Sequence, residues 1–407
     1  MIQDGEKTTL SLNNIITLDD DESLLSSLEY ARSLENRNII LEGIIDAFNN
    51  QGINYTSDDI EIILKDLNAR YKDMGIEEGL PKAVRNWING TSSGADPNRA
   101  RENMYNLCLA LDLDIDKTKE FFLKYFMTIP FNLKNCSDFV YYYGISRHRN
   151  FKEIAALMEK VKELKGKSIP ERVDATIFLG DDAELFEDDN EFLKYMEKHV
   201  YSEEYWFETA KKELEMLVES NATLLEEKYA DEIQKRIEHA KDRIQKRDDE
   251  ERVQRFKRPK DGKVNIKFLL EYIYGYSSQE SYKKGQKTLS KNAVLPEKFR
   301  KNFPIDQFFS QIDKGELHTP EPIRKALVIM NFFNYFTQMG DEILSERCDN
   351  MNAIDDDYED FIDETSGLLA KCGFVQMYAR NPFDWLIMYC AKQEDPLDAF
   401  QRLMQST

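Results

Sequence analysis

Residues 80–126 read LPKAVRNWINGTSSGADPNRARENMYNLCLALDLDIDKTKEFFLKYF. The pattern predicts a short helix that begins at Pro81 and is stopped by Gly90, because proline suits the first helical turn and glycine the position after the last. A polar loop follows, and Pro97 then opens an apolar helix. Residues 303–336, FPIDQFFSQIDKGELHTPEPIRKALVIMNFFNYF, repeat this layout. The two stretches therefore predict a helical unit that occurs twice.

The two copies share a register when they are aligned on their loop prolines, Pro97 and Pro320. Four residues after each proline stands an arginine, Arg101 in the first copy and Arg324 in the second. Apolar residues follow at seven and ten residues after the proline in both copies. These spacings place the apolar residues on one face of a helix.

This layout resembles the third and fourth helices of lambda-repressor-like (XRE-type) helix-turn-helix domains, around 80–126 and again at 303–336. In that family the short helix before the glycine enters the major groove of DNA. The resemblance implies that the outward residues of the first copy, Lys82, Arg85, Asn86 and Asn89, contact phosphates and base edges. The outward residues of the second copy carry no positive charge; they are Asp306, Gln307, Ser310, Gln311 and Asp313. We therefore expect the second copy to be structural or protein-binding, because carboxylates repel phosphates.

Composition predicts an all-α, multi-helical protein with two helical domains joined by a long charged helix. Hydrophobic residues make up 41% of the 407 residues, and there are only 17 glycines and 11 prolines. Low glycine and proline contents favour helices over a sheet with many turns. The expected segments are a polar tail at 1–20, a helical domain at 21–165, an acidic and charged helical connector at 166–262 and a second helical domain at 263–407. Helical periodicity also predicts an αα-hairpin over 137–161, and a long helix from about 191 to 258 that is broken near Asn221.

Charge is unevenly distributed along the chain. The net charge is −21, yet residues 235–301 contain 20 lysines and arginines against 10 aspartates and glutamates. This basic band is either a nucleic-acid surface or an internal partner for the acidic faces of the protein. If it supports DNA binding, the residues that contribute are Arg255, Lys257, Arg258, Lys283, Lys284 and Lys287.

No motif for catalysis, a cofactor or a metal is visible. The four histidines are isolated, and the chain has no HExxH, GxGxxG, GxxxxGK[ST] or GxSxG pattern. The aspartates at 112, 114 and 116 begin like a calcium loop, but Lys117 and Leu123 stand where that loop needs glycine and glutamate. We therefore expect no cofactor and no metal, and no enzyme, although a site assembled from distant residues remains a third reading.

Five widely spaced cysteines without a CxxC pair predict a reducing, cytoplasmic location. The N-terminus lacks the basic and apolar regions of a signal peptide, and the longest apolar run is too short to cross a bilayer. Two functions remain open. The first is a cytoplasmic regulator or accessory protein that binds double-stranded DNA. The alternative is an acidic, helical protein–protein interaction module, an adaptor or inhibitor, without a direct role in nucleic-acid binding. Neither reading specifies the oligomeric state.

Overall fold

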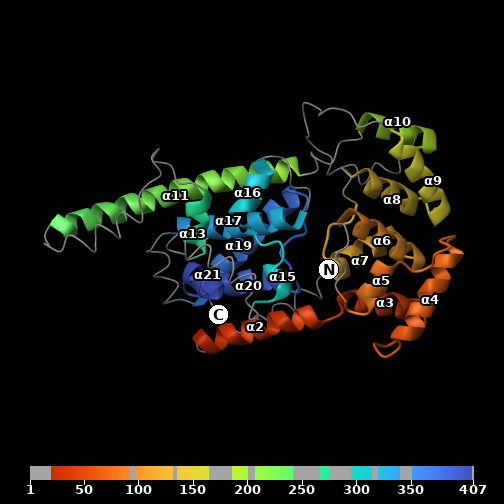
Figure 1. Ribbon diagram of the computed structural model, residues 1–407, viewed down its shortest axis with the longest axis horizontal. Helices are drawn as coiled ribbons and strands as arrows, with labels where there is room; N and C mark the ends of the chain where they lie inside the picture. Colours follow the sequence, from red (N-terminus) through yellow and green to blue (C-terminus); the bar gives the residue numbers. More distant parts are fainter. Residues whose placement is uncertain are drawn as a thin grey trace. The chain divides into compact units, whose positions relative to one another are not determined.

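The computed structural model describes residues 20–91, 97–131, 135–164, 186–199, 207–241, 266–274, 295–313, 320–339 and 351–405. Every regular element within those ranges is a helix, which confirms the predicted all-α, multi-helical class (Figure 1). The chain divides into two compact units. Unit 1 comprises 1–35, 209–372 and 376–407, and unit 2 comprises 36–208 and 373–375.

These units combine segments in a different way from the four consecutive segments expected from the sequence. Residues 20–35, at the start of the predicted N-terminal domain, group with the C-terminal part of the chain in unit 1. The long helix α11 (Glu208–Lys241) also belongs to unit 1 from Thr209 onward, where it packs on other helices. A segment placed by its tertiary contacts in this way cannot be assigned to a domain from its position in the sequence.

Unit 2 contains the first copy of the repeated unit. Its elements are α3 (Ile39–Asn50), α4 (Ile60–Asp73), α5 (Lys82–Ile88), α6 (Pro97–Ala110), α7 (Ile115–Phe121), the π-helix η1 (Phe122–Phe126), α8 (Cys136–Ser146), α9 (Phe151–Lys162) and α10 (Asp189–His199). The short helix and the apolar helix of the repeat are α5 and α6. Pro97 opens α6 as predicted, whereas Pro81 is the N-cap of α5 and precedes its first helical residue.

The predicted hairpin over 137–161 is present as α8 and α9, which pack against each other. The second helix begins with a capping box: the Asn150 side chain accepts from the Glu153 N–H, and the Glu153 side chain accepts from the Asn150 N–H. Such a reciprocal cap satisfies two N–H groups that have no partner inside the helix. Ile154, Leu157 and Met158 are buried on the inner face of α9.

Unit 1 contains the second copy. Its elements are α2 (Asp20–Asn36), α11, α13 (Ile266–Ile273), α15 (Glu297–Arg300), α16 (Asp306–Asp313), α17 (Pro320–Gln338), α19 (Met351–Lys371), α20 (Pro382–Ala391) and α21 (Pro396–Gln405). Helix α17 is the centre of this unit: twelve of its residues are buried, and it contacts α19, α20 and α21.

Helix α11 continues through Asn221, so the predicted break at that residue is wrong. Asn221 is fully buried, and its Nδ2 donates a hydrogen bond to the carbonyl of Met330 at 2.9 Å. Its Oδ1 accepts from Asn334 Nδ2 at 2.8 Å. Asparagine disfavours a helix interior because its side chain competes for backbone groups. Here that side chain instead joins α11 to α17, which run side by side in Figure 1.

Candidate nucleic-acid interface

Helix α5 presents a polar face to solvent. Lys82, Arg85 and Asn89 are exposed on it, and Asn86 is half-buried. Within the part of the chain that the structure describes, neither Lys82 nor Arg85 pairs with a carboxylate. The four residues that the sequence assigns to DNA contact thus share one side of a single helix, and its two cations are available to an external anion.

The opposite face of α5 is fixed in the core of unit 2. Val84 and Ile88 are fully buried, and the Trp87 ring packs on Phe126 with centroids 6.0 Å apart. Helices α3, α4 and α6 all contact α5. The outward face is therefore presented by a backbone that packing holds in place.

The Asn38 side chain connects α5 to α3, because it makes one hydrogen bond to each helix. Its Oδ1 accepts from the Leu41 N–H at 3.2 Å, which caps the start of α3. Its Nδ2 donates to the carbonyl of Ile88 at 2.6 Å, at the end of α5. The last carbonyls of a helix have no partner inside the helix, so this bond satisfies one of them and fixes the end of α5. Gly90 then leaves the helix with φ +68°, a conformation that glycine adopts without strain.

Carboxylates limit the size of this interface. Glu77 and Glu78 are exposed in the connection between α4 and α5, and Asp73 is exposed at the end of α4. These groups repel phosphates. Among the described residues of this region, they restrict a contact with DNA to the exposed face of α5.

The sequence assigned further residues to DNA contact. Arg255, Lys257, Arg258, Lys283, Lys284 and Lys287 lie outside the described residues. In the second copy, α16 exposes Gln307 and Ser310, and Gln311 is half-buried. The side chains of Asp306 and Asp313 lie outside the described residues.

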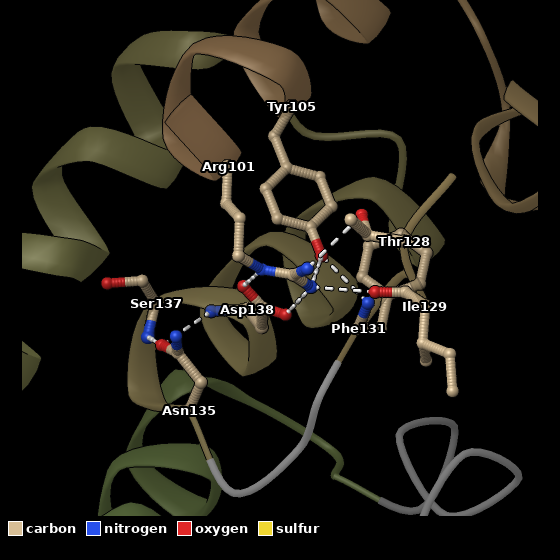
Figure 2. Close-up of polar contacts among 8 residues, drawn as sticks. All are labelled: Arg101, Tyr105, Thr128, Ile129, Phe131, Asn135, Ser137 and Asp138. Carbon is tan, nitrogen blue, oxygen red and sulfur yellow. Dashed lines mark hydrogen bonds and ion pairs between the residues drawn. The ribbon is translucent and has the colours of Figure 1, made fainter. Parts of the chain in front are cut away.

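In the core of unit 2, Arg101 joins the second turn of α6 to the first turn of α8 (Figure 2). Its guanidinium donates to both carboxylate oxygens of Asp138, of which the Nε–Oδ1 bond is 3.2 Å long. It also donates to the carbonyl of Ile129 at 2.8 Å. The Asp138 side chain is 1% exposed and that of Arg101 is 17% exposed, so the pair is largely excluded from solvent. Burial disfavours the charged guanidinium, but the Asp138 carboxylate outweighs that effect, and the pKa of Arg101 lies above its usual value.

Tyr105 completes this network one turn further along α6. Its hydroxyl oxygen accepts from the Phe131 N–H at 2.7 Å, and its ring stacks on Phe131 and Tyr141 at centroid distances of 5.2 and 4.6 Å. Burial raises the pKa of Tyr105 well above its usual value, so this hydroxyl stays neutral. Figure 2 shows the segment that carries Thr128, Ile129 and Phe131 lying against the arginine and the tyrosine. The network fixes α6, against which α5 packs.

The same ion pair occurs in unit 1. Arg324 donates to both carboxylate oxygens of Asp384, at 2.7 and 2.6 Å, and to the carbonyl of Gln376 at 3.2 Å. The Asp384 side chain is fully buried. In both units the arginine comes four residues after the loop proline, and it also binds a carbonyl from the segment that leads into the aspartate's helix.

Both aspartates occupy the third position of a helix that an asparagine caps. Asn135 Oδ1 accepts from the Ser137 and Asp138 N–H groups, and Asn381 Oδ1 accepts from the Phe383 N–H. The sequence signal is Asn-x-x-Asp, at 135–138 and 381–384. Sequence reasoning missed both aspartates, although this spacing was available. The repeat thus extends beyond the predicted stretches, to α8–α9 and α20–α21.

No group of three or more histidine, cysteine, aspartate or glutamate side chains in the described ranges could hold a metal ion. None of the described helices is both long enough and apolar enough to cross a bilayer. Comparison of the chain with protein-family models, curated proteins and solved structures finds no match.

Proposed function

We propose that this protein is a non-enzymatic regulator or accessory protein that binds double-stranded DNA through the exposed face of α5. The observation that carries the proposal is that Lys82, Arg85 and Asn89 are exposed together on one short helix, whose opposite face is locked in the core. An α-helix with its side chains is about 10–12 Å across, which fits a major groove about 12 Å wide, and the seven residues of α5 give a helix about 10 Å long to lie in it.

Each of the four side chains has a chemically suitable role at a DNA surface. Arginine binds guanine or phosphate through two parallel N–H bonds, and asparagine can bind adenine through its amide. Lysine contributes a point charge for a phosphate. We assign Lys82 to the phosphate backbone and Arg85, Asn86 and Asn89 to base edges.

Selection from a pool of random duplexes tests this function. The full chain should enrich a defined sequence, and the double variant Lys82→Ala/Arg85→Ala should lose most of the affinity for it. The matched control is Lys117→Ala/Lys119→Ala, which removes the same formal charge from α7. Those two lysines pair with Asp114 and Asp116, so their removal should leave affinity nearly unchanged. Equal losses of affinity for the selected duplex in both double variants, or no enrichment of any sequence, would exclude this interface.

A cytoplasmic location is part of the proposal. Cys108 and Cys390 are buried free thiols, Cys372 is also buried, and Cys136 is partly buried. Free cysteines packed as small apolar residues are typical of a reducing compartment. Fluorescence microscopy of the tagged protein in its native cell would test the location.

A second function, docking of a protein partner, is favoured by a separate surface of unit 2. It does not depend on the DNA-binding proposal.

A further inference from the structure

Unit 2 has a hollow of about 350 Å³ where α6, α8 and α9 meet. Glu102 and Asn106 line it from α6, Tyr141 from α8, and Ile154, Ala155 and Met158 from α9. The Tyr141 hydroxyl donates to Asn106 Oδ1 at 2.8 Å, which fixes the floor of the hollow. Neither Arg101 nor Asp138 lines the hollow, and the hollow has no part in the proposed contact with DNA.

The repeat provides a second copy of this surface for comparison. Glu102 and Lys325 each come five residues after the loop proline of their copy. Ile154 and Phe400 each come sixteen residues after the aspartate of the buried ion pair, and Ala155 and Gln401 follow them. The surface in unit 1 that corresponds to the hollow is therefore formed by α17, α20 and α21.

In unit 1 that surface is covered by the chain itself. Tyr274, at the end of α13, packs on Phe400 with ring centroids 6.3 Å apart, and the carbonyl of Tyr272 accepts from Gln401 Nε2 at 2.9 Å. Helix α15 covers the other side, where the Phe299 ring packs on Phe383 at 5.3 Å. In Figure 1, α13 and α15 both lie against this helical group. The cover consists of helical segments with aromatic anchors.

A buried lysine fixes this cover. Lys325 is 2% exposed, and its Nζ donates to the carbonyls of Lys298, Phe299 and Lys301 at 2.5, 3.2 and 2.6 Å. These carbonyls are at the C-terminal end of α15, where a helix presents partial negative charge. A donor on α17 is thus matched by acceptors on the covering segment.

In unit 2 the corresponding residue has the opposite charge. Glu102 replaces the lysine, and Glu159 adds a second carboxylate beside the hollow. Lys162, the one cation among the described residues that line the hollow, already pairs with Glu159 at 2.8 Å. An ionised carboxylate only accepts hydrogen bonds. Glu102 accepts a hydrogen bond from the Ser137 hydroxyl at 3.3 Å, and this neutral donor leaves the negative charge in place. A ligand that supplies a cationic donor therefore complements the hollow, and an anionic ligand such as a nucleic acid is disfavoured.

We propose that this hollow is a docking site for a helical segment of a partner protein that carries an aromatic anchor and a lysine or arginine. The aromatic side chain fills the space over Ile154, Ala155 and Met158, as Tyr274 packs on Phe400, the counterpart of Ile154, in unit 1. The cation pairs with Glu102. This mode is a helix laid into an apolar groove, and its affinity depends on the anchor while its specificity depends on the charge.

The experiment is a selection of displayed random peptides of about sixteen residues against the full chain. Enriched peptides should combine an aromatic residue with a lysine or arginine three or four positions away. Their affinity, measured by fluorescence anisotropy, should fall at least tenfold with Ala156→Trp, which blocks the hollow at an exposed position of α9. It should fall similarly with Glu102→Lys, which places the charge of the second copy in the first. The matched control is Glu163→Lys, which makes the same charge change at an exposed residue beyond α9 and should leave the affinity unchanged.

The proposal is overturned if no peptide is enriched, if the enriched peptides are acidic, or if their binding is insensitive to Ala156→Trp and Glu102→Lys. Displacement of a bound peptide by duplex DNA would show that the hollow takes nucleic acid. Self-association that disappears with Ala156→Trp would show that the occupant is a second copy of this chain. Far-UV circular dichroism of each variant confirms that the loss of binding is not a loss of fold.

Discussion

Arg101 donates hydrogen bonds to both carboxylate oxygens of Asp138, and through this pair the second turn of α6 is fixed to the first turn of α8. Arg324 and Asp384 form the same pair in unit 1. A buried guanidinium and carboxylate offset their desolvation only when both are present and well oriented. The pair therefore defines the repeated unit more sharply than any apolar residue in it.

Removal of one partner of this pair should strongly destabilise unit 2. We expect Asp138→Ala to lower the free energy of unfolding by about 3–5 kcal/mol, because it leaves the Arg101 guanidinium buried without its counter-charge. The control is Glu42→Ala, which breaks the exposed Arg37–Glu42 pair and should cost at most about 1 kcal/mol. Urea denaturation followed by tryptophan fluorescence and circular dichroism measures both. Similar small losses in the two variants would contradict a structural role for the buried pair.

Asn38 offers a test of how α5 is positioned. Asn38→Asp keeps an acceptor for the Leu41 N–H but replaces the Nδ2 donor to the Ile88 carbonyl with a second oxygen. We expect the free energy of unfolding to fall by about 1–2 kcal/mol, because the Ile88 carbonyl loses its donor. The cap of α3 should not be weakened, since asparagine and aspartate cap helices equally well. The same variant should lower the affinity for duplex DNA. Asn150→Asp, at the N-cap of α9, is the control and should change neither quantity much.

Lys325 predicts a pH dependence of stability. Burial lowers its pKa from 10.5 to about 8, and the neighbouring Glu321 offsets only part of that effect. Between these two pH values the unfolded chain binds more protons than the folded chain, so stability should rise with pH from about 8 to about 10.5. The rise is at most about 3.5 kcal/mol for this group, because each pKa unit corresponds to about 1.4 kcal/mol. Lys325→Met should remove this part of the rise, and the difference between the two thermal-unfolding profiles isolates it from the titration of tyrosines. Parallel profiles would show that Lys325 has an ordinary pKa.

The carboxylates beside α5 should weaken binding to DNA. Glu77→Gln/Glu78→Gln removes two negative charges from the connection that leads into the helix, so we expect duplex affinity to increase several-fold at low salt. Added salt should reduce that gain, since screening weakens repulsion between exposed charges. Glu61→Gln/Asp66→Asn, on α4, removes the same charge from the preceding helix and should have a smaller effect. Unchanged affinity in the first double variant would show that the DNA does not approach this side of α5.

Much of the local structure could be predicted from the sequence. Proline and glycine marked the two ends of α5, proline marked the start of α6, and the apolar spacing predicted α8 and α9. These features depend on local preferences and one buried face. The repeat could also be seen in the sequence: Pro320 and Arg324 have the same spacing as Pro97 and Arg101, because in each copy both residues belong to one helix.

The ion pairs could not be predicted in the same way, because their partners are at different distances along the chain. Asp138 comes 37 residues after Arg101, and Asp384 comes 60 residues after Arg324. Spacing therefore does not align the second half of the repeat, and the Asn-x-x-Asp caps are too short to be noticed alone. The helix break expected at Asn221 was wrong for a related reason. A tertiary partner, the carbonyl of Met330, stabilises an asparagine that local preference disfavours.

The central claim, that the exposed face of α5 binds DNA, is tested most directly by the salt dependence of duplex binding. The slope of log affinity against log salt concentration changes by about one for each phosphate contact that is lost. We predict that the slope becomes shallower by about one in Lys82→Ala/Arg85→Ala, because Lys82 is the residue assigned to phosphate, together with weaker binding at every salt concentration. Lys117→Ala/Lys119→Ala should keep the slope of the unmodified chain. An identical slope and affinity for the unmodified chain and Lys82→Ala/Arg85→Ala would contradict the claim.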